Sequence, residues 1–432
     1  MMESLWSATA KLPEFPQLYG TKKTDVLIIG GGIAGLLTAY LLHQSGVNYL
    51  LVEQGRICGG TTKNTTAKIT AQHGLIYHKL VKDNGVDAAR AYLRANESAL
   101  NMYTALCEKL ACDYEIRDNY VYATESPAKL ADEMEALQKI GYAAELCETL
   151  PLPIQTVGAV KFTNQAQFHP LKFLAAIAKG LNICENTFVR EMEGNTAVTA
   201  HGKIHASCVI AETHFPFLNK HGSYYLKLYQ HRSYVLALQN AQELDGMYVD
   251  EKETGFSFRN YDRLLLLGGG AHRTGKQGGN WDELRAFARK HYPAAEEKYV
   301  WAAQDCMSLD GLPYIGQYSK RTQRLFVASG FNKWGMTGAM LCAMLLRDQI
   351  LEKEKEEARL FSPSRSVWKP QLFANGYEAV KNLLTLSKPR CPHLGCALKW
   401  NSAERSWDCP CHGSRFTEDG EVLENPANGN LR

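Results

Sequence analysis

The stretch DVLIIGGGIAGLLTAYLLHQSGVNYLLVE, residues 25–53, decides the fold that we predict for the first part of this chain. Its two ends, DVLIIG and NYLLVE, are short apolar runs of the kind found in strands that are buried on both faces. The segment between them, LLTAYLLHQSG, has helical character and ends at Gly46. The pattern therefore predicts a strand, a helix and a second strand in one βαβ unit, which is typical of an α/β domain with a parallel sheet.

Three glycines lie where the first strand passes into the helix, and Gly30, Gly32 and Gly35 form the pattern G-x-G-x-x-G. The first permits a tight turn, the second lets the backbone approach a pyrophosphate, and the third allows the helix to pack closely on the strand. Glu53 ends the second strand, where a carboxylate can accept hydrogen bonds from ribose hydroxyls. We therefore predict a Rossmann-like dinucleotide-binding domain; the alternative is a glycine-rich structural turn.

Length and composition limit the remaining possibilities. A chain of 432 residues is long enough for two or three domains, and 45% hydrophobic with 22% charged residues is typical of a globular protein. The net charge of +3 is small and no basic block stands out, so we expect no nucleic-acid partner. The N-terminus lacks the apolar core of a signal peptide, and the most apolar stretch, residues 336–346, is too short to cross a bilayer. We therefore expect a cytoplasmic protein without a transmembrane segment.

The cysteines divide into two groups. Eight of the twelve are scattered singly through the first 350 residues, but the other four lie within 21 residues, beside two histidines. The sequences there are CPHLGC, residues 391–396, and CPCHGSRF, residues 409–416. This density of cysteine and histidine predicts a metal site that holds either zinc or an asymmetric [2Fe–2S] cluster. The residues that we expect as ligands are Cys391, His393, Cys409 and His412.

Each of the two loops supplies one cysteine and one histidine, whereas zinc fingers with this ligand set normally pair the cysteines first and the histidines last. The spacing, together with the flanking Leu394–Gly395 and Gly413–Ser414, closely resembles that of Rieske proteins. The resemblance implies a [2Fe–2S] cluster with thiolates on one iron and imidazoles on the other. Zinc remains the alternative.

The same resemblance has implications for four neighbouring side chains. Respiratory Rieske proteins have a disulfide between the equivalents of Cys396 and Cys411, so the resemblance implies one here, and two free thiols are the alternative. Ser414 matches the family serine whose hydroxyl donates to a cluster sulfide, which stabilises the reduced state. Phe416 stands where the respiratory proteins commonly have tyrosine. We therefore expect a reduction potential inside the Rieske range of about −150 to +300 mV but below its respiratory extreme.

A second resemblance covers residues 20–355. Besides the βαβ unit and a Gly-Gly-Thr-Thr loop, three stretches carry it: QAQFHPLKFLAAIA at 165–178, DGLPYIG at 310–316 and FVASGFNKWGMTGAMLCAMLL at 326–346. Together they resemble the D-amino-acid oxidase and glycine oxidase superfamily of FAD enzymes. In that superfamily the last helix points its N-terminus at the flavin, where it stabilises negative charge on the ring. The cofactor-binding residues that the resemblance implies are Gly30, Gly32, Gly35, Glu53, Gly60, Thr61, Thr62, Val189, Gly330, Gly335, Met336 and Thr337.

The two resemblances imply the domain organisation. We expect an FAD-binding domain over residues 20–360, into which a mixed α+β substrate subdomain is inserted at about residues 91–160 and 216–300. Residues 361–387 are expected to be a linker. Residues 388–432 are expected to form a small all-β Rieske subdomain, which lacks the usual strands before the first ligand loop and therefore leans on the flavin domain.

The expected activity follows from the two cofactors. Such an enzyme would oxidise the CH–NH group of a small amine or amino-acid-like substrate by hydride transfer to FAD. Electrons would then pass singly through the cluster to or from a partner, either a protein or a quinone. The alternative is an electron-transfer or redox-sensing protein without a small-molecule substrate. The candidates for a catalytic role are Arg232, which either clamps a substrate carboxylate or is structural, and Lys333, which overhangs the flavin together with Trp334.

Overall fold

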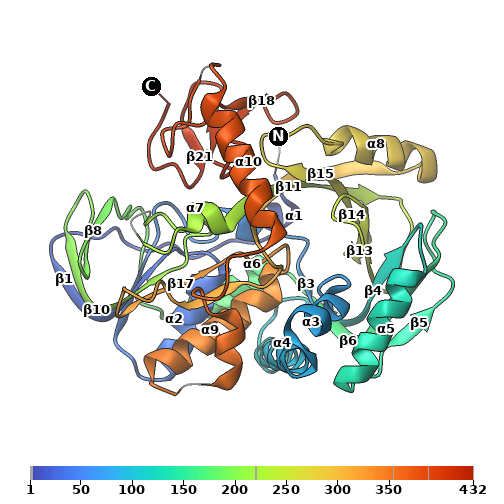
Figure 1. Cartoon of the computed structure of the whole chain (residues 1–432), viewed down its shortest axis with the longest axis horizontal. Coiled ribbons are helices and arrows are strands. Elements are labelled where there is room, and N and C mark those ends of the chain that lie inside the picture. The colour runs from blue at the N-terminus through green and yellow to red at the C-terminus, as the bar shows by residue number, and fades with distance from the viewer. Residues whose placement is uncertain (1–2, 219–220, 354, 388, 432) are drawn as a thin grey trace.

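The computed structural model describes residues 3–218, 221–353, 355–387 and 389–431. These residues form three sheets with helices around them (Figure 1). One sheet lies at the left of the view and a second lies at the right, and the C-terminal part, drawn in red, sits above both. The predicted fold class, a Rossmann-like domain with a mixed substrate sheet and a small all-β C-terminal part, is confirmed.

The first sheet is the Rossmann-like core, and its central strands run parallel. In the described residues it has eight strands. In spatial order they are β16 (Tyr314–Gln317), β17 (Leu325–Ser329), β10 (Lys203–Ala211), β1 (Lys22–Ile29), β2 (Tyr49–Val52) and β7 (Ile183–Cys184), with β8 (Glu191–Glu193) and β9 (Thr196–Val198) attached to β10 as a hairpin. The apolar runs at residues 26–29 and 49–52 are buried throughout, as expected for strands covered on both faces.

The second sheet lies largely in the region where we expect the substrate subdomain, and it is called the substrate sheet below. It has nine strands in the described part of the chain and is mostly antiparallel. In spatial order they are β15 (Glu296–Ser308), β11 (Leu228–Gln239), β14 (Leu264–Arg273), β13 (Ser257–Tyr261), β12 (Met247–Asp250), β4 (Glu115–Ala123), β6 (Gly158–Gln167) and β3 (Lys68–Ile69), with β5 (Glu145–Cys147) beside β6.

The helices lie around the sheets (Figure 1). They are α1 (Leu5–Thr9), α2 (Ile33–Gln44), α3 (Ile76–Asn84), α4 (Val86–Cys107), α5 (Ala128–Ile140), α6 (Pro170–Ile177), α7 (Tyr224–Lys227), α8 (Asn280–His291), α9 (Gly335–Ile350) and α10 (Pro370–Leu384), with short 3-10 turns η1 (Thr61–Asn64) and η2 (Glu356–Phe361). Helix α2 lies between the first sheet and α9, which explains why it is apolar on nearly all sides.

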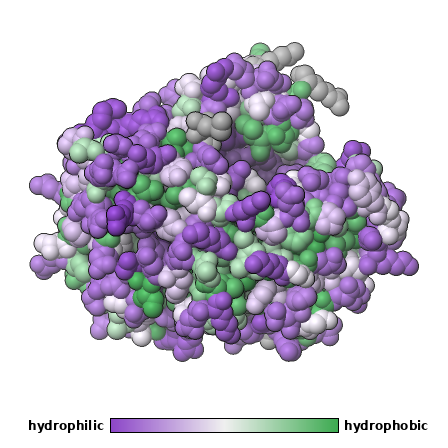
Figure 2. All heavy atoms as spheres, turned by 180° about the vertical axis from the view of Figure 1, so that it is seen from behind, coloured by the Kyte–Doolittle hydropathy of each residue, from purple (hydrophilic) through white to green (hydrophobic). Residues whose placement is uncertain are grey.

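The third sheet belongs to the C-terminal part. Its four short antiparallel strands, counted in the described residues, are β18 (Lys399–Asn401), β19 (Ser406–Asp408), β20 (Arg415–Thr417) and β21 (Val422–Glu424). Residues 361–387, which we expected as a linker, contain helix α10, and this helix packs beside the third sheet (Figure 1). No helix of the described residues is long and apolar enough to cross a membrane. Seen from behind, hydrophilic side chains cover most of the outer surface (Figure 2).

Buried ion pairs join the third sheet to the second. The guanidinium of Arg232, on β11, donates from Nε to Glu404 Oε1 at 3.0 Å and from Nη1 to Glu424 Oε1 at 3.2 Å, and its Nη2 also pairs with Glu404. Arg415, on β20, donates to Glu404 at 2.8 Å and to Asp408 at 2.9 Å. Burial alone would raise the pKa of Glu404, but Arg232 and Arg415 outweigh it and lower the pKa to about 2. The network therefore fixes the C-terminal part on the substrate sheet.

We predict that Arg232→Met lowers the free energy of unfolding by about 3–5 kcal/mol, because it leaves buried carboxylates without half of their countercharge. Denaturant unfolding followed by tryptophan fluorescence measures the change. The matched control is Arg405→Met, because Arg405 pairs with Glu418 at the surface and its loss should change the stability by less than about 1 kcal/mol. Equal effects of the two variants would contradict the role given to this network.

Candidate functional site

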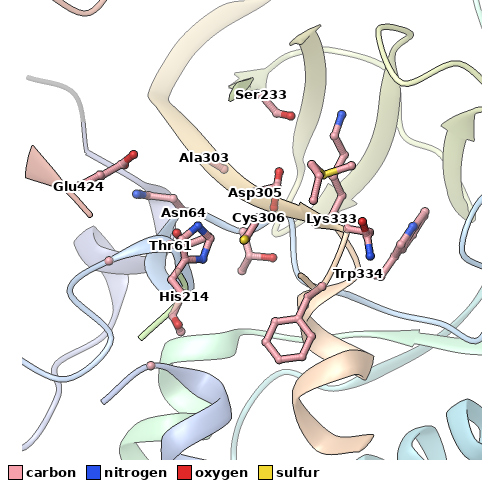
Figure 3. A pocket seen from close by; sticks show the side chains of 18 of the residues that line it. Thr61, Asn64, His214, Ser233, Ala303, Asp305, Cys306, Lys333, Trp334 and Glu424 are labelled. Atoms are coloured by element: carbon pink, nitrogen blue, oxygen red, sulfur yellow. The ribbon is translucent and has the colours of Figure 1, made fainter. Parts of the chain in front are cut away.

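A cavity of about 990 Å³ lies where the first sheet, the second sheet and the C-terminal part meet. It extends from the glycine loop, past the start of α9, to the turn between β12 and β13. Figure 3 shows part of its lining, with Glu424 on one side and Lys333 and Trp334 on the other. Most residues from Val422 to Asn430, in the C-terminal part, close one side of it. The cavity thus connects the predicted dinucleotide site with the substrate sheet.

Nine of the predicted cofactor-binding residues line this cavity. They are Gly30, Gly32, Glu53, Gly60, Thr61, Thr62, Val189, Gly335 and Met336. The other three do not line it. Gly35 packs against Gly30, Gly330 faces Leu228 and Ser308, and the Thr337 hydroxyl donates to Thr70 O at 2.8 Å.

The glycine loop has the geometry that its sequence predicts. Gly30 takes a φ of +117°, and a Cβ there would lie 2.3 Å from the carbonyl oxygen of Glu212. A Cβ on Gly35 would lie 1.9 Å from the carbonyl oxygen of Gly30, so α2 approaches β1 as closely as glycine allows. Gly32, Ile33 and Ala34, at the start of α2, line the cavity, so the positive end of the helix dipole borders it, which suits a pyrophosphate.

Glu53 follows β2 and its carboxylate borders the same cavity. It accepts hydrogen bonds from Gly31 N at 2.7 Å and from Gly55 N at 2.9 Å. Burial raises the pKa of Glu53, and these backbone hydrogen bonds oppose the increase. With Val189 beside it, this acidic group at the end of the second strand fits the adenosine half of FAD.

The start of α9 faces the other end of the cavity. Lys333 and Trp334 precede the helix and line the cavity, and Trp334 stacks on His73 with ring centres 5.0 Å apart. Lys333 Nζ donates to Glu253 O at 3.0 Å, and burial lowers the pKa of Lys333 while nearby Asp305 opposes the decrease. Figure 3 shows Lys333, Trp334 and Cys306 around this end. The helix end, the cationic Lys333 and the aromatic pair fit the flavin half of FAD.

Arg232 does not line the cavity, because its guanidinium is held in the ion pairs with Glu404 and Glu424 described above. The structure therefore does not bring Arg232 together with Lys333. This position in a buried ion-pair network agrees with a structural role for Arg232, and it does not agree with a role in binding a substrate carboxylate.

The two cysteine–histidine loops lie side by side in the C-terminal part. Each closes on itself, since Cys391 N donates to Cys396 O at 2.9 Å and Cys409 N donates to Ser414 O at 2.8 Å. Gly395 and Gly413 take φ values of +79° and +84° at the two turns, where glycine is free of strain.

The four expected ligands meet between the loops. The rings of His393 and His412 lie 5.0 Å apart with their planes at 89°. The thiol of Cys391 interacts with that of Cys409 and with the Ser414 hydroxyl. Nδ1 of His412 is buried and has no hydrogen-bond partner among the described residues. Two thiols and a buried imidazole nitrogen without a partner fit the ligand set of a Rieske cluster.

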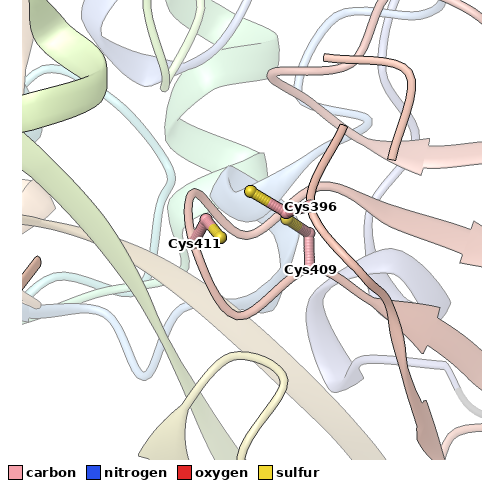
Figure 4. A group of neighbouring side chains, drawn as sticks. All are labelled: Cys396, Cys409 and Cys411. Atoms are coloured by element: carbon pink, nitrogen blue, oxygen red, sulfur yellow. The ribbon is translucent and has the colours of Figure 1, made fainter. Parts of the chain in front are cut away.

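Cys396 and Cys411 are free thiols in the structure. Their sulfur atoms and that of Cys409 lie within 4.8 Å of one another (Figure 4). Phe416 is fully buried beside them in the small core of the C-terminal part. The disulfide that the resemblance implies is therefore not formed between these two residues in the structure, although their thiols are neighbours.

The loop of residues 409–416 lies against the wall of the flavin cavity. Gln230 Nε2 donates to His412 O at 3.1 Å, and Gln230 Oε1 is hydrogen-bonded at 2.9 Å to the ring of His214, which lines the cavity. Gln304 Nε2 donates to Gly413 O at 2.8 Å, while the backbone oxygen of Gln304 accepts from Thr61 at 3.1 Å. A Cβ on Gly413 would lie 2.5 Å from Gln230 Cβ, so the loop and the wall are in tight contact.

Sequence reasoning missed His214, Gln230 and Gln304. No local motif marks them, because they come together only when β10, β11 and β15 are in place. One signal was present: Gln230, Arg232 and Tyr234 alternate along β11, and all three form hydrogen bonds to the C-terminal part. Polar residues at alternate positions of a buried strand indicate a face that docks on another polar surface.

Two family models match the chain. That of the FAD dependent oxidoreductases, DAO, matches residues 25–349, and that of the Rieske [2Fe-2S] domain matches residues 345–432. The chain therefore belongs to the DAO family of FAD dependent oxidoreductases and has a C-terminal Rieske domain. Its cofactors are FAD and a [2Fe–2S] cluster, and both predicted cofactors are confirmed.

Particular relatives agree with this assignment. The chain is 34% identical to a protein of Bacillus subtilis (strain 168) named as a Rieske 2Fe-2S iron-sulfur protein, YhfW, over 98% of this chain and 96% of that protein. L-Proline dehydrogenase from P. horikoshii superposes with a TM-score of 0.67 at 16% identity, over 80% of this chain and 98% of that one. Glycine oxidase from Geobacillus kaustophilus superposes with a TM-score of 0.67 at 19% identity, over 80% of this chain and 100% of that one. Likeness at these identities shows the fold of the flavin part.

We predict that Gly35→Ala removes most of the bound flavin, because the added methyl group would overlap the Gly30 carbonyl and push α2 away from β1. The ratio of flavin to protein, measured by absorbance after purification, tests this. The matched control is Gly376→Ala on α10, where a Cβ meets no atom within 4 Å, and it should keep its flavin. A Gly35→Ala protein with a full complement of flavin would contradict the packing argument.

Proposed function

We propose that the protein is a dehydrogenase that oxidises the CH–NH group of a small amine or amino acid and passes the electrons singly through its cluster to an acceptor. The observation that carries the proposal is the wall shared by the two cofactor sites. His214 borders the flavin cavity, and only Gln230 separates its ring from the backbone of the cluster ligand His412. When bound, FAD accepts two electrons as hydride and the cluster carries one electron at a time.

The charged groups at the flavin end of the cavity support an amino-acid-like substrate. Lys333 supplies a cation and Asp305 supplies a carboxylate, and both line the cavity. Burial raises the pKa of Asp305, and Lys333 opposes the increase. In our proposal Lys333 binds a substrate carboxylate and Asp305 orients the amine. Trp334, stacked on His73, would exclude water from one side of the reacting carbon.

The close contact between the C-terminal part and the wall supports electron transfer inside the molecule. Gln230 and Gln304 each hold one carbonyl of the loop 409–416, and Arg273 donates to Pro410 O at 3.1 Å and to Cys411 O at 3.2 Å. These bonds would keep the cluster loop at a fixed position relative to the flavin. In this proposal Gln230, Gln304 and Arg273 hold the cluster loop and take no part in the redox chemistry.

A second candidate function is an electron carrier or redox sensor without a small-molecule substrate. One observation favours it: Leu394, in the first cluster loop, is exposed and could face a protein partner, although Pro410 in the second loop is buried. The cavity argues against it, since it continues beyond the expected flavin-binding loops to two charged residues, Asp250 at the end of β12 and Glu253 in the turn after it.

We further propose that Cys396 and Cys411 form a disulfide in the mature protein, because their sulfur atoms are neighbours and the bond would join the two cluster loops. The eight cysteines outside the two cluster loops are spread singly along the chain, which is compatible with the cytoplasm that we propose as its location.

We predict that one member of a panel of amines, amino acids and hydroxy acids bleaches the flavin under anaerobic conditions and then reduces the cluster. In Cys391→Ser the same substrate should still bleach the flavin, but reduction of a one-electron acceptor should be lost, because this variant lacks a thiolate ligand. The matched control, Cys147→Ser, changes an isolated cysteine on β5 and should behave as wild type. Rapid peroxide formation by Cys391→Ser and wild type alike would contradict the proposal. Cluster reduction by a protein partner without any bleaching would favour the second candidate.

We predict that unfolded, unreduced protein has two fewer reactive thiols than protein that was reduced first, as counted with a thiol reagent in the presence of a chelator. Cys396→Ser should abolish this difference and lower stability by about 3 kcal/mol, the value expected for closing a loop of about 15 residues. Equal thiol counts before and after reduction would mean that both cysteines stay free.

A further inference from the structure

Helix α10 exposes its apolar side chains. Phe373, Tyr377, Val380 and Leu384 follow the spacing of a single helix face. The exposed fraction is 66% for Phe373, 66% for Tyr377 and 75% for Leu384. A surface helix of a globular protein normally turns such a face toward the core. The apolar face of α10 therefore has no partner among the described residues.

The opposite face of α10 is polar, and it is buried. Asn375 and Asn382 are 5% and 2% exposed. Arg273 donates to Asn375 Oδ1 at 2.9 Å, Lys276 forms an ion pair with Glu378, and Ala397 N donates to Asn382 O at 3.0 Å. These bonds fix the rotation of the helix, because turning the apolar face inward would break all of them and bury unpaired polar groups.

The apolar face continues beyond the helix at both ends. Trp368 precedes α10 and Leu386 follows it, and both are exposed. More than half of the large hydrophobic side chains that are exposed in the described part of the chain lie between Trp368 and Leu394. The term α10 surface is used here for Trp368, Phe373, Tyr377, Val380, Leu384 and Leu386. Contiguous exposed apolar surface of this kind marks a site of interaction with a partner or a membrane.

Basic side chains border the α10 surface. A second hollow, of about 310 Å³, adjoins Trp368 and is lined by Lys227, Lys320 and Arg365. Arg365 is paired with Asp310, and Lys227 is buried and donates from Nζ to Pro363 O at 2.8 Å. Lys320 is exposed and forms no ion pair among the described residues. On the helix itself, the ammonium of Lys381 lies 6.0 Å from the ring centre of Tyr377. Cationic groups thus accompany the apolar residues at the start and in the middle of the surface.

We propose that the α10 surface binds a membrane that carries anionic lipids. The apolar side chains would enter the boundary between headgroups and acyl chains, and Lys320 and Lys381 would contact headgroup phosphates. An apolar helix face rich in aromatic residues and bordered by lysine is the pattern of helices that lie in the plane of a membrane surface. A helix of 15 residues is too short to cross a bilayer, so it would lie along the surface.

Charge distinguishes a membrane from a second copy of this chain. A symmetric dimer on the α10 surface would bring Lys320 and Lys381 of each copy toward like charges, whereas the cytoplasmic leaflet is negative and attracts them. The inference rests on exposed residues and on charge, and it does not depend on the proposed substrate chemistry.

Sedimentation of the purified holoprotein with vesicles tests the proposal. Wild type should bind vesicles of phosphatidylcholine with phosphatidylglycerol and bind pure phosphatidylcholine more weakly. The triple variant Phe373→Ser, Tyr377→Ser, Leu384→Ser should lower the partition coefficient at least about a hundredfold, because each side chain loses its apolar burial. The double variant Lys320→Glu, Lys381→Glu should lower binding about tenfold or more, on anionic vesicles only and with a weaker salt dependence.

The matched control is Tyr19→Ser, Ile116→Ser, Leu146→Ser, which removes three exposed apolar side chains elsewhere on the molecule and should bind as wild type. Flavin and cluster absorbance, unchanged in every variant, verifies that each one is folded. Wild type that stays in the supernatant with both kinds of vesicle overturns the proposal, and so does a control variant that loses as much binding as the α10 variant. Wild type that ignores vesicles and forms a dimer, which the α10 variant dissociates, overturns it in favour of a second copy.

Discussion

The buried pairing of Arg232 and Arg415 with Glu404 is the interaction on which the arrangement of the cofactor sites depends. The four short strands of the C-terminal part enclose a core made largely of cysteines, with Phe416 and a few other apolar residues. A core of this size contributes little stability by itself. Buried ion pairs add little net stability either. They do restrict how the C-terminal part can sit on the substrate sheet, because any shift would leave a buried charge without its partner. The substrate sheet thus both supports the cluster loops and fixes their position.

Once the C-terminal part is docked in this position, close contacts and hydrogen bonds hold the loop 409–416 in place. Gly413 is in contact with Gln230 at a distance that only glycine allows, and the carbonyl groups of the loop are taken up by Gln230, Gln304 and Arg273. The same strands, β11 and β15, form part of the flavin cavity wall. One sheet therefore positions both cofactor sites, and a change in its packing would affect the separation between them.

The parts of the molecule that sequence predicts well are those in which neighbouring residues along the chain share one task. The glycines of residues 30–35 and the expected ligands in the two cysteine–histidine loops depend on local backbone geometry, so their spacing alone is enough to predict them. Gln230 and Gln304 lie on β11 and β15, and His214 lies in the bend after β10, so the three residues are remote in sequence and meet only in the folded structure. For Arg232 the sequence left two roles open, a substrate clamp or a structural residue. The pattern of a strand shows which face of the sheet a residue lies on, but it does not show what packs against that face. The exposure of the apolar face of α10 could not be predicted from its sequence, since apolar residues at this spacing normally indicate a helix face that packs against the core.

The cluster loops differ in their surroundings, and this difference gives the two proposals a common physical basis. The loop with His412 is buried against the flavin side, while the loop of residues 391–396 has Leu394 at the surface. Arg390, immediately before this outer loop, donates to Gly395 O at 2.7 Å and to Leu383 O at 3.3 Å, so the outer loop is tied to the end of α10. A surface that receives α10 would therefore also lie close to the exposed side of the cluster. In that arrangement electrons would enter on the inner side, from the flavin, and leave on the outer side, where an acceptor dissolved in the membrane could approach.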